Sequence, residues 1–293
     1  MSIRPRRSVL YVPGTNARAL EKARTLPVDA VVLDLEDSVA PEAKETARKQ
    51  VREAVSARAF GPREVAVRIN GLETEWWLAD VDMIHDVKPD AIVVPKVTRA
   101  ETIENLAGRL MDIGADHAIR VWAMMESPLA ILHAEEIAAV AHDIETRLSC
   151  LIIGTNDLAL TMRARIVPGR GPMLPWIATC IAAARAHGID ILDGPYNSIS
   201  DAAGFAAECA QARDLGFDGK TIIHPNQVDA CNAAFSPSAP EIAEATKIAA
   251  AFDLPENKGK GVIALDGRMV ERLHADMARR TLAIAEAIAA RQA

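Results

Sequence analysis

Short apolar segments alternate with longer polar segments along most of the chain. The apolar segments are rich in Val, Ile and Leu, and nearly every position in them is apolar. They lie at residues 8–12, 30–35, 64–69, 91–95, 119–125, 148–154, 189–193 and 220–224. A short run that is apolar throughout is typical of a parallel strand covered on both faces. The pattern therefore predicts eight buried parallel strands.

Segments with helical character separate the predicted strands. Two clear examples are residues 41–59 and 199–216, and the second follows Ser198 and ends at Gly216, residue types that begin and end helices. Eight strand–helix repeats within about 235 residues favour an α/β fold, a (β/α)8 or TIM barrel. A doubly wound open sheet is the alternative. It usually has fewer strands and often a glycine-rich first turn, which is absent from this sequence.

The pattern changes after Phe235. We expect a catalytic barrel domain over residues 1–235 and a C-terminal helical extension over residues 236–293. Within the extension, residues 253–262 are rich in turn-forming residues, and a last helix is expected at about 270–290. Such an extension would pack against the barrel or reach over its mouth as a lid, with the turn-rich segment as its hinge.

Composition narrows the function class. The chain has 293 residues, and 33 Lys and Arg against 40 Asp and Glu give a net charge of −7. An acidic balance argues against general binding to nucleic acid or to an anionic membrane surface. No apolar run approaches the ~18 residues of a membrane helix, and the first is too short for a signal-peptide core. The four cysteines have no C-x-x-C spacing, so we expect a cytoplasmic enzyme in a reducing compartment.

Polar residues follow the predicted strands. In a TIM barrel the carboxyl ends of the strands form the mouth, where catalysis takes place. The polar residues at these positions are Asn16, Asp34, Glu36, Asp37, Arg68, Asn70, Lys96, Glu126, Asn156, Asp157, Asp193, Lys220 and His224. Because charged groups are costly to bury unpaired, their clustering predicts a mouth lined with carboxylates and a few cations.

Two of these carboxylates suggest a divalent cation. Glu126 and Asp157 follow adjacent predicted strands, and Mg²⁺ typically takes one or two carboxylates and keeps several waters. The alternative is that Glu126 caps the helix that opens at Ser127, and that Asp157 caps the helix that follows it. The spacing alone does not choose between these interpretations.

The remaining acids and Arg68 favour an ion-pair network. Asp34, Glu36 and Asp37 are expected to pair with Arg68 and Lys96 rather than to bind a metal directly. The planar guanidinium of Arg68 also suits a substrate carboxylate, and the two roles do not exclude each other.

Three further features could contribute to the site. The backbone amides of Gly154, Thr155 and Asn156 enter a predicted helix and could hold a carboxylate. His224 has the chemistry of a general base, but a histidine hydrogen-bonded at the end of the last strand is favoured. Basic residues near the N-terminus could receive phosphates, although such a group is more often a solvated face. These residues are Arg6, Arg7, Lys22 and Arg24.

An ordered set of motifs covers nearly the whole chain. It consists of RSVLYVPG (7–14), VVLDLEDSV (31–39), VRIN (67–70), VPKV (94–97), MMESP (124–128), GTNDLA (154–159), DGPY (193–196) and IHPNQ (223–227). The set resembles the citrate lyase β-subunit/malyl-CoA lyase family, CoA-ester lyases of the HpcH/HpaI aldolase group. The resemblance implies a (β/α)8 barrel, a homotrimer or hexamer, and Mg²⁺ as cofactor.

The resemblance also implies residue roles. Glu126 and Asp157 match the metal ligands of the family, and Arg68 matches the arginine that binds and polarises the 2-oxoacid. Glu36 and Asp37 match an acidic pair that orders metal-bound water and that arginine. More loosely, the N-terminal basic residues, Arg7 and Lys22 among them, fall where the phosphates of CoA are often held.

The implied reaction is cleavage of a short 3-hydroxy-dicarboxyl-CoA, namely malyl-, citramalyl- or citryl-CoA. A retro-Claisen, aldol-type step would give acetyl-CoA and a 2-oxoacid (oxaloacetate or pyruvate) or glyoxylate. In malyl-CoA lyases an aspartate in a C-terminal G-x-M-hydrophobic-D motif, donated by a neighbouring subunit, is the acid–base. Here Glu271 occupies that position, and Asp266 is a less well supported substitute.

Two alternatives belong to the same resemblance. The first is a malyl-CoA thioesterase, which would release free CoA. The second is a citrate lyase β subunit that works only in a complex with acyl-carrier and transferase subunits.

Overall fold

A computed structural model of the chain describes residues 3–292 and divides it into two compact units. The larger unit is Arg6–Ala234. The smaller unit begins at Phe235 and also includes residues 3–5.

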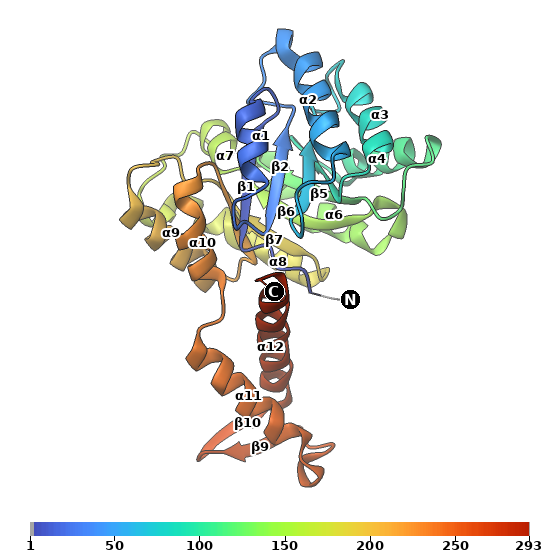
Figure 1. Ribbon diagram of the computed structural model, residues 1–293. Coiled ribbons are helices and arrows are strands. Elements are labelled where there is room, and N and C mark those ends of the chain that lie inside the picture. Colours follow the sequence, from blue (N-terminus) through green and yellow to red (C-terminus); the bar gives the residue numbers. More distant parts are fainter. Residues whose placement is uncertain (1–2, 293) are drawn as a thin grey trace. The chain divides into compact units, whose positions relative to one another are not determined.

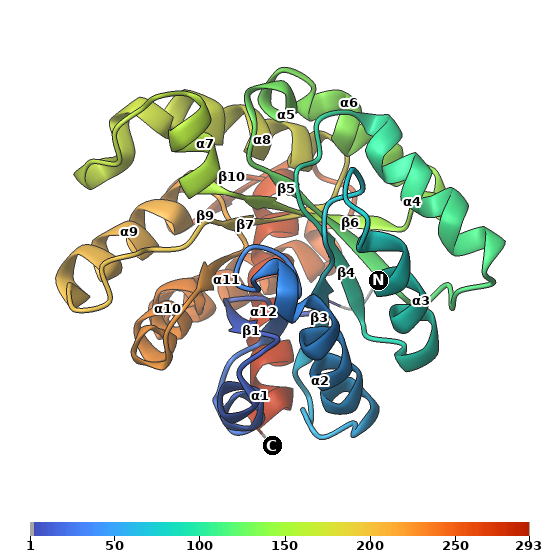
Figure 2. The same cartoon turned by 90° about the horizontal axis from the view of Figure 1, so that it is seen from above.

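The larger unit is a closed barrel of eight parallel strands (Figure 1, Figure 2). The strands are β1 (Ser8–Pro13), β2 (Ala30–Asp34), β3 (Glu64–Arg68), β4 (Ala91–Val94), β5 (Arg120–Met125), β6 (Leu148–Ile153), β7 (Asp190–Asp193) and β8 (Gly219–Ile222). Since β1 pairs in parallel with both β2 and β8, the sheet closes on itself. The predicted barrel is confirmed, and the open-sheet alternative is wrong.

Helices follow the strands and surround the barrel (Figure 2). They are α1 (Ala17–Ala23), α2 (Lys44–Ser56), α3 (Trp77–Val87), α4 (Ala100–Asp112), α5 (Pro128–Leu132), α6 (Ala134–Ala139), α7 (Thr155–Thr161), α8 (Leu174–Ala186), α9 (Ala202–Leu215) and α10 (Val228–Phe235). Short 3₁₀ turns are η1 (Pro41–Ala43), η2 (Val140–His142), η3 (Ile144–Thr146), η4 (Pro168–Met173) and η5 (Pro225–Gln227).

Helix α9 shows how local sequence sets these boundaries. Asp201, rather than the expected Ser198, caps the helix by accepting a hydrogen bond from the backbone N–H of Gly204. Gly216 ends it with a φ of 99°, a left-handed conformation that glycine adopts without strain.

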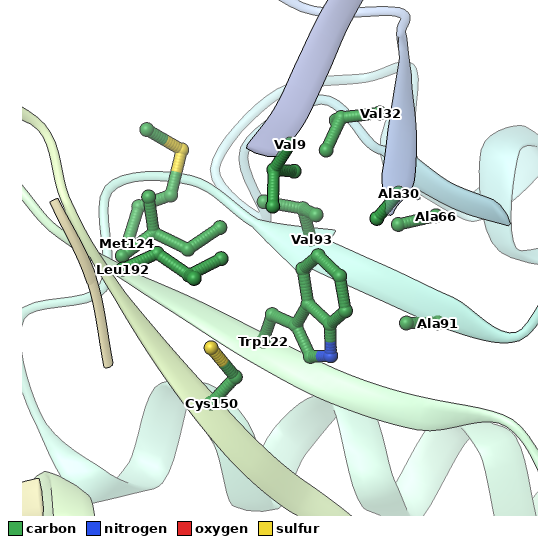
Figure 3. Packing of buried hydrophobic residues seen from close by; sticks show 11 residues of the cluster. Val9, Ala30, Val32, Ala66, Ala91, Val93, Trp122, Met124, Cys150 and Leu192 are labelled. Carbon is green, nitrogen blue, oxygen red and sulfur yellow. The ribbon is translucent and has the colours of Figure 1, made fainter. Parts of the chain in front are cut away.

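The interior of the barrel is packed with side chains (Figure 3). Trp122 on β5 is fully buried there, and small residues on three other strands leave room for its indole ring. These residues are Ala30, Ala66 and Ala91. Large residues beside small ones let the layers of a barrel interlock, so this part of the interior is solid rather than a channel.

Ion pairs hold the amino ends of the strands together. Arg6 donates to both carboxylate oxygens of Glu64 at 2.7 and 2.8 Å, and to Asp190 at 2.5 Å. Arg7 binds Asp29 through its side chain and its backbone N–H. Both arginines precede β1 and therefore lie at the end opposite the mouth. The expectation that Arg7 holds a phosphate of CoA does not fit this structure, because Arg7 is buried in a structural pair with Asp29.

The smaller unit contains two helices and a β-hairpin. Its elements are α11 (Ala239–Asp253), η6 (Pro255–Asn257), β9 (Val262–Leu265), β10 (Arg268–Glu271) and α12 (Arg272–Gln292). Ser238 and Glu241 form a capping box at the start of α11. Phe252, Ile263 and Ala275 form its small core.

The hairpin corrects the expectation of a purely helical extension. Asp266 and Gly267 both have positive φ, 52° and 74°, as a tight type I′ hairpin turn requires. Residues 268–271 are therefore a strand, and the last helix starts at Arg272. Among the described residues, no helix combines the length and the apolar character that crossing a bilayer needs.

Candidate active site

A cavity of about 370 Å³ lies at the mouth of the barrel. Its polar wall contains most of the residues that the sequence singled out, namely Asp34, Asp37, Arg68, Glu126, Gly154, Thr155, Asn156 and Asp157. Its apolar wall includes Tyr11, Met124, Ile152 and Ile223. The structure thus brings a set of ionisable groups into one space with an apolar side, as binding sites for small organic acids require.

Arg68 is held rigidly at the end of β3. Its Nε and Nη2 donate to the two carboxylate oxygens of Asp34 at 2.6 and 2.7 Å, and its guanidinium lies 5.0 Å from the centre of the Tyr11 ring. Burial works to raise the pKa of Asp34, but the charge and hydrogen bonds of Arg68 outweigh it and hold that pKa below its ordinary value. The pair is therefore fully ionised at neutral pH.

The predicted ion-pair network continues from Arg68 to Lys96. Glu36 lies 3.0 Å from Arg68 Nη1 and 2.9 Å from Lys96 Nζ, and Lys96 also lies 3.8 Å from Asp37. Glu36 is buried, whereas the Asp37 side chain is 52% exposed at the mouth. The sequence interpretation of these acids as an ion-pair network is confirmed.

Lys44 fixes the loop that carries these acids. Its Nζ donates to the carbonyl oxygens of Leu35 and Glu36, both at 2.8 Å. The sequence does not indicate this role, since a lysine in a helix gives no sign that it reaches the preceding loop. Tyr11 was not expected at the site either, because an apolar strand pattern does not distinguish it from core.

Glu126 has an unusual environment for a carboxylate. It is 3% exposed, and its Oε1 accepts a hydrogen bond of 2.6 Å from the backbone N–H of Lys96. Its Oε2 has no hydrogen-bond partner among the described residues. The pKa of Glu126 is raised to about 8, chiefly by burial and to a smaller extent by the nearby charges of Glu36 and Asp157. A buried carboxylate oxygen without a partner is costly unless a ligand completes it.

Asp157 reaches this area from the next strand. Strand β6 ends at Ile153, and Asp157 lies half-buried in the first turn of α7. Gly154 lets the turn come close to Glu126, since a Cβ at this position would lie 2.4 Å from the Cβ of Glu126. Only glycine therefore permits this approach.

The helix-capping alternative for these two acids is wrong. Ser127 caps α5 by accepting from the backbone N–H of Ala130, and Gly154 occupies the N-cap position of α7. Glu126 and Asp157 are thus available to a cation. Within residues 3–292 no three His, Cys, Asp or Glu side chains form a metal-binding group. Two carboxylates, with the other positions left to water and substrate oxygens, fit Mg²⁺ rather than a metal that needs a full protein cage.

Several other predicted residues lie away from the cavity. Asp193 and Lys220 pair with each other behind the barrel wall, because their side chains point outward from the strands. His224 caps η5 through its Nδ1, as the favoured interpretation held. Lys22 is exposed in the last turn of α1. Asn156, by contrast, lines the cavity and exchanges hydrogen bonds with Asn197.

Glu271 belongs to the smaller unit. It is the last residue of β10, and its backbone N–H donates to His274 Nδ1. Asp266, the possible substitute, lies in the hairpin turn and pairs with Lys247.

Comparisons with known proteins identify the family. The family model of HpcH/HpaI aldolase/citrate lyase matches residues 7–225. The chain is 48% identical over 286 residues to a (3S)-malyl-CoA thioesterase of Cereibacter sphaeroides, covering 98% of this chain and 96% of that protein. It is 35% identical to an L-malyl-CoA/β-methylmalyl-CoA lyase of the same species, covering 92% and 91%.

A solved structure shows the same fold over almost the full length. CitE from Mycobacterium tuberculosis, in complex with magnesium, acetoacetate and coenzyme A, aligns with a TM-score of 0.76 and 28% identity, covering 96% of this chain and 98% of that one. The sequence motifs, the barrel and these matches lead to one conclusion, that the chain belongs to the HpcH/HpaI aldolase/citrate lyase family.

Proposed function

We propose that the protein is a Mg²⁺-dependent thioesterase for a short 3-hydroxy-dicarboxyl-CoA of the malyl-CoA type. The observation that carries the proposal is the grouping of Glu126, Asp157 and Arg68 around one cavity. Two carboxylates suit a divalent cation, and a guanidinium suits the free carboxylate of the acyl group. The 48% identity to a malyl-CoA thioesterase favours hydrolysis over the carbon–carbon cleavage that the sequence motifs first suggested.

Arg68 would hold the free carboxylate of the substrate. A guanidinium has five N–H donors, and Asp34 takes one from Nε and one from Nη2. Glu36 lies beside Nη1. Nη1 also donates to Met124 Sδ at 3.8 Å, so within residues 3–292 the second hydrogen of Nη2 is the one left for a substrate carboxylate. Because Asp34 and Glu36 already hold Arg68 in place, its side chain loses little conformational entropy when the substrate carboxylate binds.

Glu126 and Asp157 would hold Mg²⁺. When bound, the ion would act as a Lewis acid toward oxygens of the substrate. The residues themselves fit this role, because the raised pKa of Glu126 shows a carboxylate that gains from any positive partner. When the cation is absent, a proton would bind to the Glu126 carboxylate instead.

Asp37 is the candidate for orienting the attacking water. Its carboxylate is half exposed at the mouth and lines the cavity, and Lys96 lies 3.8 Å away. It can accept a proton from water that attacks the thioester carbonyl, with CoA leaving as the thiol. Glu36 supports this arrangement indirectly by holding both Arg68 and Lys96.

A product assay tests the proposal. Purified protein is incubated with malyl-CoA, with Mg²⁺ or with a chelator, and the products are separated by chromatography. We expect free CoA and malate in the presence of Mg²⁺ and neither with the chelator. Acetyl-CoA is the matched control substrate, since it lacks the carboxylate that Arg68 would bind, and it should be hydrolysed far more slowly.

Carbon–carbon cleavage is the second candidate, because a relative at 35% identity is a malyl-CoA lyase. It would give acetyl-CoA and glyoxylate in the same assay, and it requires an acid–base group for which Glu271 stands in the family position. Citramalyl-CoA and citryl-CoA would test whether pyruvate or oxaloacetate is released instead. Any turnover by the isolated chain would reject the interpretation as a subunit active only in a complex.

Two further expectations belong to this proposal. Lys22 is proposed to contact a phosphate of CoA, since it is an exposed cation on the helix that follows β1. A homotrimer or hexamer is expected, which light scattering of the purified protein would measure.

A further inference from the structure

A buried cluster of four charged residues lies behind the wall of the cavity. The cluster, here called the Lys220 cluster, consists of Arg170, Asp193, Glu208 and Lys220. Asp193 and Lys220 are fully buried, and Arg170 is 2% exposed. Buried ion pairs often add no stability over apolar side chains of similar size, so a cluster at this depth is a candidate for a more specific role.

Lys220 binds both the cluster and the backbone of Gly194, the residue before Pro195 of the cavity wall. Its Nζ donates to Asp193 at 2.7 Å, to Glu208 at 2.7 Å and to the carbonyl oxygen of Gly194 at 2.6 Å. These bonds use all three donors of the ammonium group. Arg170 binds Asp193 as well, through Nη1 at 2.6 and 2.8 Å. Asp193 thus has two cationic partners, Arg170 and Lys220. Of these two, Lys220 also binds the carbonyl oxygen of Gly194.

Gly194 lies very close to the backbone turn that carries Asp157. A Cβ on Gly194 would lie 2.6 Å from Thr155 Oγ1 and 2.7 Å from the carbonyl oxygen of Ile153, distances that real Cβ atoms do not show. The backbone of Gly194 therefore defines how far the turn from Ile153 to Asp157 can move toward β7. Asp157 follows Thr155 by two residues in the first turn of α7.

We propose that Lys220 is a positioning residue for the divalent cation, acting through Gly194 on the turn that carries Asp157. The contacts form a continuous chain from the Lys220 ammonium to the Gly194 carbonyl, and from the Gly194 backbone to Ile153 and Thr155. Strand alternation places Lys220 outside the barrel wall while its neighbour Thr221 lines the cavity. Lys220 therefore acts on the ligand position without touching cation or substrate.

The inference rests on the proposed function, and its test measures metal binding without turnover. Mn²⁺ serves as the probe, and its affinity is measured by calorimetry and by electron paramagnetic resonance in the absence of substrate. We expect Lys220→Met to weaken Mn²⁺ binding by about tenfold, the effect typical of losing support for a ligand. Arg170→Met is the matched control, because it also removes a buried cation from Asp193 but leaves the Gly194 contact.

The control should lose thermal stability as Lys220→Met does, while its Mn²⁺ affinity changes by less than about twofold. Equal Mn²⁺ affinities in the two variants would overturn the inference. Failure of the wild-type protein to bind Mn²⁺ would instead overturn the proposed function, and this inference with it.

A second pair of variants decides the question if the buried-charge variants do not fold. Gly194→Ala acts at the other end of the chain of contacts and should weaken Mn²⁺ binding by displacing Thr155. Gly171→Ala is its control, since a Cβ there meets no described atom within 4 Å. Wild-type affinity in Gly194→Ala would contradict the inference.

Discussion

At the amino end of the barrel Arg6 and Arg7 are matched by carboxylates, whereas at the mouth Glu126 keeps a buried oxygen without a partner among the described residues. Both ends contain buried charge on similar strands. The amino end can be understood from the protein alone, because its hydrogen bonds are made within the chain. The mouth cannot be understood in this way. The raised pKa of Glu126 reflects the free-energy cost of burying its charged form, and a bound cation would remove that cost. Among the described residues, the buried carboxylate oxygens without a hydrogen-bond partner belong to Glu36 and Glu126, and both residues lie at the mouth.

The largest effect should come from removing a carboxylate at the mouth. Glu126→Gln and Asp157→Asn should each lower Mg²⁺-dependent turnover by more than about 100-fold, since each removes a proposed ligand of the ion. Glu126→Gln should keep or raise the melting temperature, because a buried acid is replaced by a neutral amide. Glu64→Gln at the amino end is the matched control and should lose stability with unchanged kcat. Normal turnover in both mouth variants would refute the metal assignment.

The second comparison exchanges one arginine at each end. Arg6→Met and Arg68→Met should each lower the free energy of unfolding by about 3–5 kcal/mol, because each leaves buried carboxylates unpaired. Only Arg68→Met should also abolish binding of malate and oxaloacetate, measured by calorimetry under conditions where both variants are folded. Normal binding by Arg68→Met would contradict the assigned role of the guanidinium.

A smaller effect is expected in the pH dependence of stability, where Glu126 at the mouth should contribute. Glu126 has its pKa raised from 4.5 to about 8 in the folded chain, so the folded state binds this proton more tightly than the unfolded state. Its contribution to stability is therefore fully present below about pH 4.5 and is lost as the pH rises toward 8. Chemical unfolding without divalent cations should show this decline, and Glu126→Gln should remove it. A decline that is identical in both proteins would assign it to other groups.

The smallest effect is expected at Lys22. Because this side chain is exposed, losing its contact with a phosphate in Lys22→Ala should raise KM for the CoA ester by about two- to fivefold. The same acyl group on pantetheine, which lacks the nucleotide phosphates, is the control and should show equal KM values for both proteins. An unchanged KM for the full CoA ester would place the phosphates elsewhere.

The barrel could be predicted because its strands are apolar at nearly every position. The rule that chemistry lies just after such strands also located Arg68, Glu126 and Asp157. The same rule failed for Asp193 and Lys220, because it gives the level of a residue along a strand but not the face on which its side chain lies. Lys220 points outward, whereas the adjacent Thr221 lines the cavity.

Two other errors have different causes. Arg7 was expected to hold a phosphate of CoA, but it precedes the first strand and therefore lies at the end of the barrel opposite the mouth. The hairpin of the smaller unit was missed because apolar residues continue from β9 into α12, although Asp266-Gly267 is a strong turn signal. The open oxygen of Glu126 could not be predicted at all, because it depends on how closely Gly154 lets two loops approach.

Trp122 and the alanines around it block the barrel below the cavity, so a molecule that enters from the mouth has no second exit. For a substrate with its acid group at Arg68 and its CoA directed outward, this geometry fixes the order in which the two products leave the cavity. The thiol must go first and the dicarboxylic acid last. Free malate should then compete directly with the CoA ester, and its escape rather than bond breaking could limit the rate.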